Sequence, residues 1–247
     1  MMLKTKVMRP AIAMLELIFA IVIMGIILMS APQLISTAAQ SGYVAIQQEG
    51  INEAASQVNM IMGYHWDEKD TDERYIDPIL DVSVSGNGDT ELDEEGNSSR
   101  RLGTPEESYR SFVRSDGVDL VASAPSSFGN ADLNETEKDD MDDFANSDTS
   151  LVFIPETTYE ANQADYIETS TIDIARDVVY SNDAANYNQS SITFDPSFTD
   201  AGGRTNIKSI IVTLTSSSTA EELNKKEITL RGFSCNIGGY KLEEREF

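Results

Sequence analysis

A run of 21 residues from Ala11 to Ala31 contains a single charged side chain, that of Glu16. A helix of this length rises about 31 Å, which matches the roughly 30 Å thickness of the hydrocarbon core of a bilayer. The run therefore predicts a membrane-length helix near the N-terminus, and such a helix needs apolar surroundings to cover it.

Basic residues are placed unevenly around this run. Lys4, Lys6 and Arg9 precede it, and no acidic residue does. Short flanking segments rich in lysine and arginine stay in the cytoplasm. We therefore expect a single-pass membrane protein with its N-terminus in the cytoplasm and the rest of the chain outside.

The carboxylate of Glu16 needs a partner, because a charge at the centre of a membrane helix costs about 2.5–3.5 kcal/mol and somewhat less toward its ends. The run from Ala11 to Ala31 contains no lysine, arginine or histidine. Cleavage after Ala11 would create a positively charged amino group on Ile12, and Glu16 would become the fifth residue of the new chain. A carboxylate in the first helical turn also complements the helix dipole.

The stretch RPAIAMLELIFAIVIMGIILMSAP resembles the N-terminal segment of type IV pilins and type II secretion pseudopilins. In that family a short basic leader ends at a small residue, glutamate follows at the fifth mature position, and the apolar helix contains a glycine and then a proline. Glu16, Gly25 and Pro32 occupy those places here. Ala11 stands at the cut, where glycine is usual.

This resemblance implies that a prepilin peptidase removes residues 1–11 and methylates the amino group of Ile12. It also implies that Glu16, with Gly25 and Pro32 on the same helix, takes part in filament assembly, where Glu16 meets the amino group of a neighbouring subunit. The implied partners are other pilin or pseudopilin subunits, the peptidase and an inner-membrane assembly platform. The implied location is the inner membrane, with the C-terminal domain periplasmic or extracellular, and the filament after assembly. We expect a minor pilin-like subunit of a type IV pilus or type II secretion filament, acting in assembly, secretion or DNA uptake.

The alternative is an uncleaved single-pass membrane protein with an acidic extracytoplasmic domain that binds calcium or a cationic partner. The two hypotheses differ in the N-terminus of the mature protein. We expect Ile12 for a pilin-like subunit and Met1 for the uncleaved protein.

A helical pattern continues after Pro32. We expect a transmembrane or filament-core helix over residues 12–32 and an amphipathic continuation over residues 33–65 that packs on a globular domain. We expect kinks or flexible points at Pro32, Gly42 and Gly50, and two separate helices are the alternative. The apolar positions that recur at three- and four-residue steps, with one longer gap, are Ile35, Ala39, Tyr43, Ile46, Ala54, Val58 and Ile61.

Residues 66–150 are polar and acidic, and we interpret them as a loop-rich insertion whose bulk favours a minor subunit in a filament. ILDVSVS is a short strand pattern within it. We expect poor packing here unless a cation such as calcium neutralises the acids, and a solvated acidic loop is the alternative. The candidate metal ligands are Asp139, Asp140, Asp142 and Asp143.

Residues 151–247 predict an antiparallel β-sheet domain, because short strand patterns alternate with polar connections. A long helix packed on one antiparallel sheet gives an α+β fold, and the pilin family shares that layout. The strand patterns are SLVFIP, ARDVVYS, SSITFD, KSIIVTLTS and KEITLRGFSC.

Composition argues against several classes of function. The net charge of -24 disfavours direct binding of nucleic acid. The single histidine, His65, and the single cysteine, Cys235, make a zinc site or a histidine-based catalytic triad a poor interpretation. The sequence contains no P-loop or dinucleotide fingerprint. We therefore expect no enzymatic activity and no cofactor other than calcium.

Overall fold

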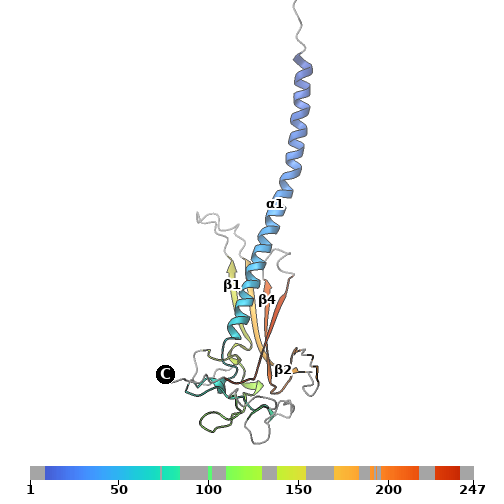
Figure 1. Cartoon of the computed structure of the whole chain (residues 1–247). Helices are drawn as coiled ribbons and strands as arrows, with labels where there is room; N and C mark the ends of the chain where they lie inside the picture. Colours follow the sequence, from blue (N-terminus) through green and yellow to red (C-terminus); the bar gives the residue numbers. More distant parts are fainter. Residues whose placement is uncertain are drawn as a thin grey trace, which may run out of the picture. The chain divides into compact units, whose positions relative to one another are not determined.

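The computed structural model describes residues 9–72, 74–83, 100–101, 110–129, 138–153, 170–183, 190–191, 193, 196–216 and 226–239. One long helix, α1 (Arg9–Ile61), precedes a five-stranded antiparallel sheet (Figure 1). This arrangement confirms the predicted α+β fold. The chain divides into two compact units, Met1–Glu49 and Gly50–Phe247.

The sheet has the order β1-β2-β4-β5, and β3 pairs with β2 outside this path. All pairs are antiparallel, with Ile174 opposite Leu214 and Val212 opposite Leu230. Side chains alternate between the two faces of a strand, so this register places apolar residues together on one face. The strands are β1 (Ser147–Phe153), β2 (Ser170–Asp183), β3 (Pro196–Asp200), β4 (Ile207–Ser216) and β5 (Ile228–Cys235).

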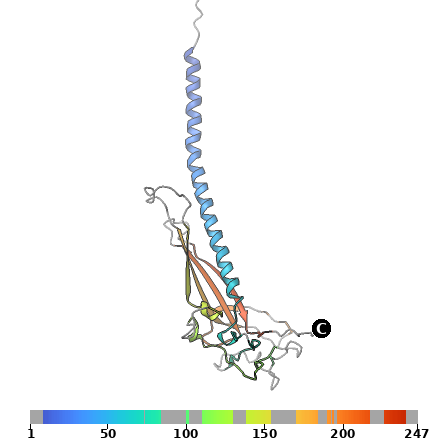
Figure 2. The same cartoon turned by 90° about the vertical axis from the view of Figure 1, so that its left-hand side faces the viewer.

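Within the second unit, the last turns of α1 lie against one face of the sheet (Figure 2). Two glycines allow this close approach. A Cβ atom added at Gly50 would lie 3.0 Å from Cδ1 of Ile172, and one added at Gly232 would lie 2.9 Å from Cγ1 of Val58. The buried side chains of this interface include Ala54, Val58 and Ile61 on the helix and Ile172, Ile174, Val178, Ile210, Val212 and Leu214 on the strands.

The helix is continuous to Ile61, so the alternative of two separate helices is wrong. Pro32 lies inside α1 without ending it. Gly42 and Gly50 do not end it either, because a glycine in a helix costs only about 1 kcal/mol relative to alanine.

Four of the five predicted strands of the sheet overlap β1, β2, β4 and β5. SSITFD is wrong in its described positions, since Ser190, Ser191 and Thr193 lie outside any strand and β3 begins only at Pro196. β1 begins at Ser147, inside the predicted insertion.

ILDVSVS forms only an isolated bridge between Asp81 and Val121 in its described part. The carboxylate of Asp81 accepts hydrogen bonds from the backbone amide and the hydroxyl of Ser83 at 2.8 Å and 2.6 Å. Such a local side-chain turn competes with strand pairing and ends the extended segment.

The described parts of residues 66–150 are packed, so the expectation of poor packing is wrong for them. The side chain of Asn236 makes two hydrogen bonds with the backbone of Leu80. Its Oδ1 accepts from the Leu80 amide at 3.0 Å, and its Nδ2 donates to the Leu80 carbonyl at 2.7 Å. The buried apolar residues of this part are Trp66, Ile79, Leu80, Val82, Phe112, Ala122, Met141, Phe144 and Ala145.

We predict that Gly232→Val destabilises the protein by about 1–3 kcal/mol, because the added side chain overpacks the interface with Val58 and Met62. Urea unfolding of the full chain in detergent measures the change. Thr229→Val, at an exposed position of the same strand, is the matched control and should change stability little. Equal effects of the two variants would contradict the close contact.

Candidate functional site

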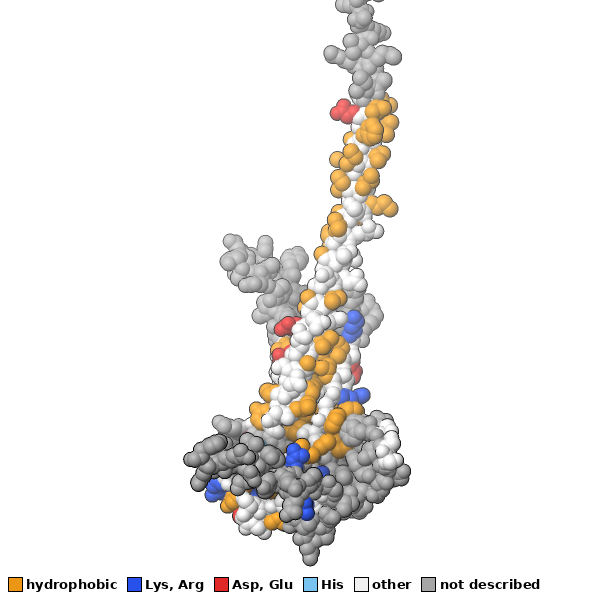
Figure 3. Space-filling model, in the orientation of Figure 1, with side chains coloured by type: hydrophobic (Ala, Val, Ile, Leu, Met, Phe, Trp, Pro, Cys, Tyr) orange, Lys and Arg blue, Asp and Glu red, His pale blue; other side chains and the backbone are white. Residues whose placement is uncertain are grey.

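The first part of α1 presents apolar side chains on all sides. Residues 13–42 are all exposed, including Leu28 at 73% and Met29 at 80% (Figure 3). By length and composition, this helix can cross a membrane, with a mean hydropathy of 2.5 in its most apolar 18-residue window. Water is a poor environment for such a surface, so the segment needs a bilayer or other apolar helices around it.

The residues predicted for processing and assembly all lie on this part of α1. Ala11 and Ile12 fall within the first helical turn, and their side chains lie outside the described ones. Glu16 is exposed, and the described part of the chain offers it no ion pair. A Cβ atom added at Gly25 would have no neighbour within 4 Å, and Pro32 lies inside the helix.

A second site centres on Lys208, a residue of β4 whose side chain is fully buried. Its ammonium group donates three hydrogen bonds: to the carbonyl of Trp66 at 2.7 Å, to Oδ2 of Asp67 at 3.0 Å and to Oδ1 of Asp142 at 2.6 Å. An ammonium group has three N–H donors, so every one of them is satisfied. The geometry therefore removes much of the cost of burying this charge.

Aromatic rings complete the surroundings of Lys208. Its Nζ lies 4.1 Å from the ring centroid of Trp66, 4.9 Å from that of Phe128 and 5.2 Å from that of Tyr180. The negative faces of aromatic rings attract cations, most strongly away from water. Lys208 thus joins the end of the sheet to segments that precede β1 in the chain.

Asp67 is the ionised partner in this cluster. It caps the short helix η1 (Glu68–Asp70), accepting from the Lys69 amide at 3.2 Å, and it also accepts from the amide and hydroxyl of Ser123 at 2.9 Å and 2.8 Å. Burial alone would raise the pKa of Asp67. The charge of Lys208 and the hydrogen bonds from Ser123 outweigh burial and hold that pKa below its usual value.

The other buried acids of the cluster behave in the opposite way. Burial raises the pKa of Asp142, in the short helix η6 (Asp142–Phe144), to about 8 although Lys208 opposes the shift. Burial, reinforced by nearby carboxylates, also raises the pKa of Asp140 to about 7 and that of Asp70 to about 8. The single ammonium group of Lys208 cannot neutralise all four buried carboxyl groups. Asp67 therefore carries the negative charge, and the other three carboxyl groups are neutralised by bound protons.

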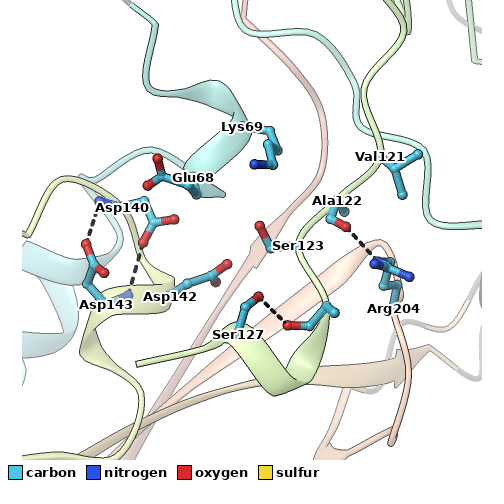
Figure 4. Close-up of a pocket in the computed structure, with 11 residues that line it drawn as sticks. Glu68, Lys69, Val121, Ala122, Ser123, Ser127, Asp140, Asp142, Asp143 and Arg204 are labelled. Atoms are coloured by element: carbon cyan, nitrogen blue, oxygen red, sulfur yellow. Dashed lines mark hydrogen bonds between the residues drawn. The ribbon is translucent and has the colours of Figure 1, made fainter. Parts of the chain in front are cut away.

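The four predicted calcium ligands lie together in one turn, but they do not converge on a point. Oδ1 of Asp140 accepts from the Asp143 amide at 3.0 Å (Figure 4). Oδ2 of Asp143 accepts from the Asp139 amide at 3.1 Å, and Asp142 binds Lys208. Among the described residues, no group of three or more acids, histidines or cysteines has an arrangement that could hold a metal ion. Calcium binding by these four residues stays a prediction.

Asp140 and Asp142 also line a pocket of about 240 Å³ (Figure 4). Lys69 and Arg204 line it too, and Nε of Arg204 donates to the carbonyl of Ala122 at 2.6 Å. Because charges of both signs surround this small space, we interpret it as part of the structural cluster.

Sequence reasoning missed Lys208, although a signal for it exists. In KSIIVTLTS, Lys208 shares its alternation with Ile210, Val212 and Leu214, the residues that face the core. A charged residue at a core position of a strand indicates a buried partner, because an unpaired buried charge is too costly to tolerate.

The chain matches no protein-family model, no curated protein and no solved structure.

The buried acids predict that stability falls as the pH rises from 5 to 8. Folded Asp70, Asp140 and Asp142 hold protons with pKa values of about 8, 7 and 8, whereas the ordinary value is 3.8. The folded state therefore binds more protons in this window, and each titrating group lowers the free energy of unfolding by up to about 1.4 kcal/mol per pH unit. Asp67 has the opposite sign, but its effect lies below this window.

Urea unfolding at several pH values measures this slope. Asp140→Asn should make the slope shallower, and Asp148→Asn, at an exposed position of β1, should leave it unchanged. Stability that rises from pH 5 to 8 would show that these acids are ionised in the folded protein.

We predict that Lys208→Met destabilises the protein at pH 7 by about 3–5 kcal/mol, because it leaves Asp67 as an uncompensated buried charge. Adding Asp67→Asn should recover part of the loss. Lys226→Met changes an exposed lysine and is the control. Thermal or urea unfolding provides the measurement, and equal effects of Lys208→Met and Lys226→Met would rule out a structural role for the buried ammonium.

Proposed function

We propose that this protein is a minor pilin-like subunit, or pseudopilin, of a type IV pilus or type II secretion filament. It acts in assembly, secretion or DNA uptake without catalysis. One observation carries the proposal: the apolar part of α1 over residues 13–31 is exposed and is interrupted by a single carboxylate, Glu16. A helix that served only as a membrane anchor would not need a carboxylate at this position. In the core of a filament, the carboxylate of Glu16 can form an ion pair with a neighbouring subunit.

The position of Glu16 suits such a pairing. Ile12 and Glu16 are four residues apart in α1, so they lie on the same face of the helix. After cleavage between Ala11 and Ile12, each subunit would carry a positive amino group and a negative side chain about one helical turn apart. The two charges of neighbouring subunits can then pair at one axial offset, which sets the spacing of the filament.

The second unit supports a structural role for the protein. It has its own core and an internal ionic cluster in which Lys208 and Asp67 satisfy each other. A folded domain at the end of a filament helix can present a surface without acting on a substrate. The bulk of residues 66–150 favours a minor subunit, since side domains crowd a filament built from many copies.

We predict that the mature protein begins at Ile12 with a methylated amino group. Mass spectrometry of the protein isolated from its native membrane tests this, because prepilin peptidase would remove residues 1–11. A native chain that keeps these residues would contradict the proposal and favour the uncleaved membrane protein.

We predict that Glu16→Ala abolishes crosslinking to partner pilins in native membranes but preserves membrane insertion. Insertion should survive because the helix becomes more apolar. Assembly should fail because breaking one side of a buried ion pair costs about 3–5 kcal/mol.

Two further variants sharpen this experiment. Glu16→Gln keeps the size of the side chain and removes its charge, so it should fail like Glu16→Ala. Glu49→Ala removes another exposed carboxylate of α1 and should crosslink normally. Normal crosslinking of both Glu16 variants would mean that Glu16 is not an assembly contact.

A further inference from the structure

A second pocket, of about 520 Å³, lies at the end of β5. Tyr64, Trp66, Phe233 and Ile237 form its apolar and aromatic walls. Phe233 is 38% exposed and Ile237 is 48% exposed. Large apolar side chains around an open pocket are typical of a binding site.

The same pocket contains two acids. Asp77 places its Oδ2 3.5 Å from Nδ1 of His65. Asp70 is 5% exposed, and its Oδ1 has no hydrogen-bond partner. No lysine or arginine is among the described residues that line the pocket. A buried carboxylate oxygen without a partner is costly, so this site lacks a hydrogen-bond donor.

We propose that this pocket binds an organic cation, a guanidinium or alkylammonium group on a short apolar stem. Its N–H groups would donate to Asp70, and its stem would pack against Tyr64, Phe233 and Ile237. Aromatic rings favour a cation beside them, and a charge-assisted hydrogen bond satisfies the buried oxygen. A metal ion fits less well, since no group of three ligating side chains is arranged for it among the described residues.

A bound cation would also be linked to protons. Burial, with the charges of Asp67, Asp77 and Asp140, raises the pKa of Asp70 to about 8, and the charge of Lys208 opposes the shift. A cation beside Asp70 favours the ionised carboxylate and displaces its proton. Binding should therefore tighten as the pH rises from 6 to 9. This site does not depend on the proposed role in a filament.

Isothermal titration of the full chain in detergent tests the proposal with butylguanidine. N-Butylurea, which has a similar shape and no charge, is the control ligand. We expect butylguanidine to bind at millimolar or lower concentration, to bind more tightly at pH 9 than at pH 6, and to bind more tightly than N-butylurea. Failure of butylguanidine to bind, or equal binding of N-butylurea, would overturn the proposal.

A short peptide with one arginine, acetyl-Gly-Arg-Gly-amide, distinguishes two sources of the same chemistry. Tighter binding of the peptide than of butylguanidine would indicate the side chain of a protein partner. Tighter binding of butylguanidine would indicate a free small cation.

Variants locate the ligand. Asp70→Asn should weaken binding of butylguanidine about tenfold or more and remove the pH dependence, because the anion partner is lost. Phe233→Ala, at a position that is 38% exposed, should weaken binding and provides the test if Asp70→Asn fails to fold. Asp148→Asn should change nothing. Unchanged binding in Asp70→Asn or Phe233→Ala, or zinc binding that His65→Ala abolishes in place of butylguanidine binding, would overturn the proposal.

Discussion

The hydrogen bonds of one buried ammonium group connect the parts of the second unit. Lys208 projects from β4 and binds a carbonyl and two carboxylates that belong to the segment between α1 and β1. Those bonds attach η1 and η6 to the end of the sheet. An acidic segment that would otherwise repel itself gains a fixed counter-charge there, and Trp66, Phe144 and Met141 can then be buried around it.

The two units differ in how their apolar side chains are covered. Residues 13–42 leave their apolar side chains uncovered, so their stability depends on what surrounds the protein. The second unit covers its own apolar residues, and Gly50 and Gly232 make room for the last turns of α1 against the strands. The first unit thus requires an apolar environment, whereas the second has a core of its own.

The spacing of apolar residues in the sequence predicted those helices and strands whose apolar positions are buried on one face. The helix was predicted from apolar residues at three- and four-residue steps, and β4 from alternation at Ile210, Val212 and Leu214. β3 was missed because it begins at a proline and pairs irregularly with β2. The ionic cluster was missed because Lys208 lies 141 residues from Asp67 and 66 residues from Asp142, and no local pattern links them.

The distance along the chain between Lys208 and its partners also fixes an order of events during folding. Trp66 and Asp67 emerge 142 and 141 residues before the lysine that they bind. Until β4 has been synthesised, the acids of the middle segment have no counter-charge from it, and the first strands lack the neighbour that lies between β2 and β5. Contacts of such long sequence separation form slowly, because the intervening chain must first be closed into a loop. The late arrival of β4 therefore gives β2 its partner strand and the acids of the middle segment their counter-charge in one step, and β5 then adds the edge strand.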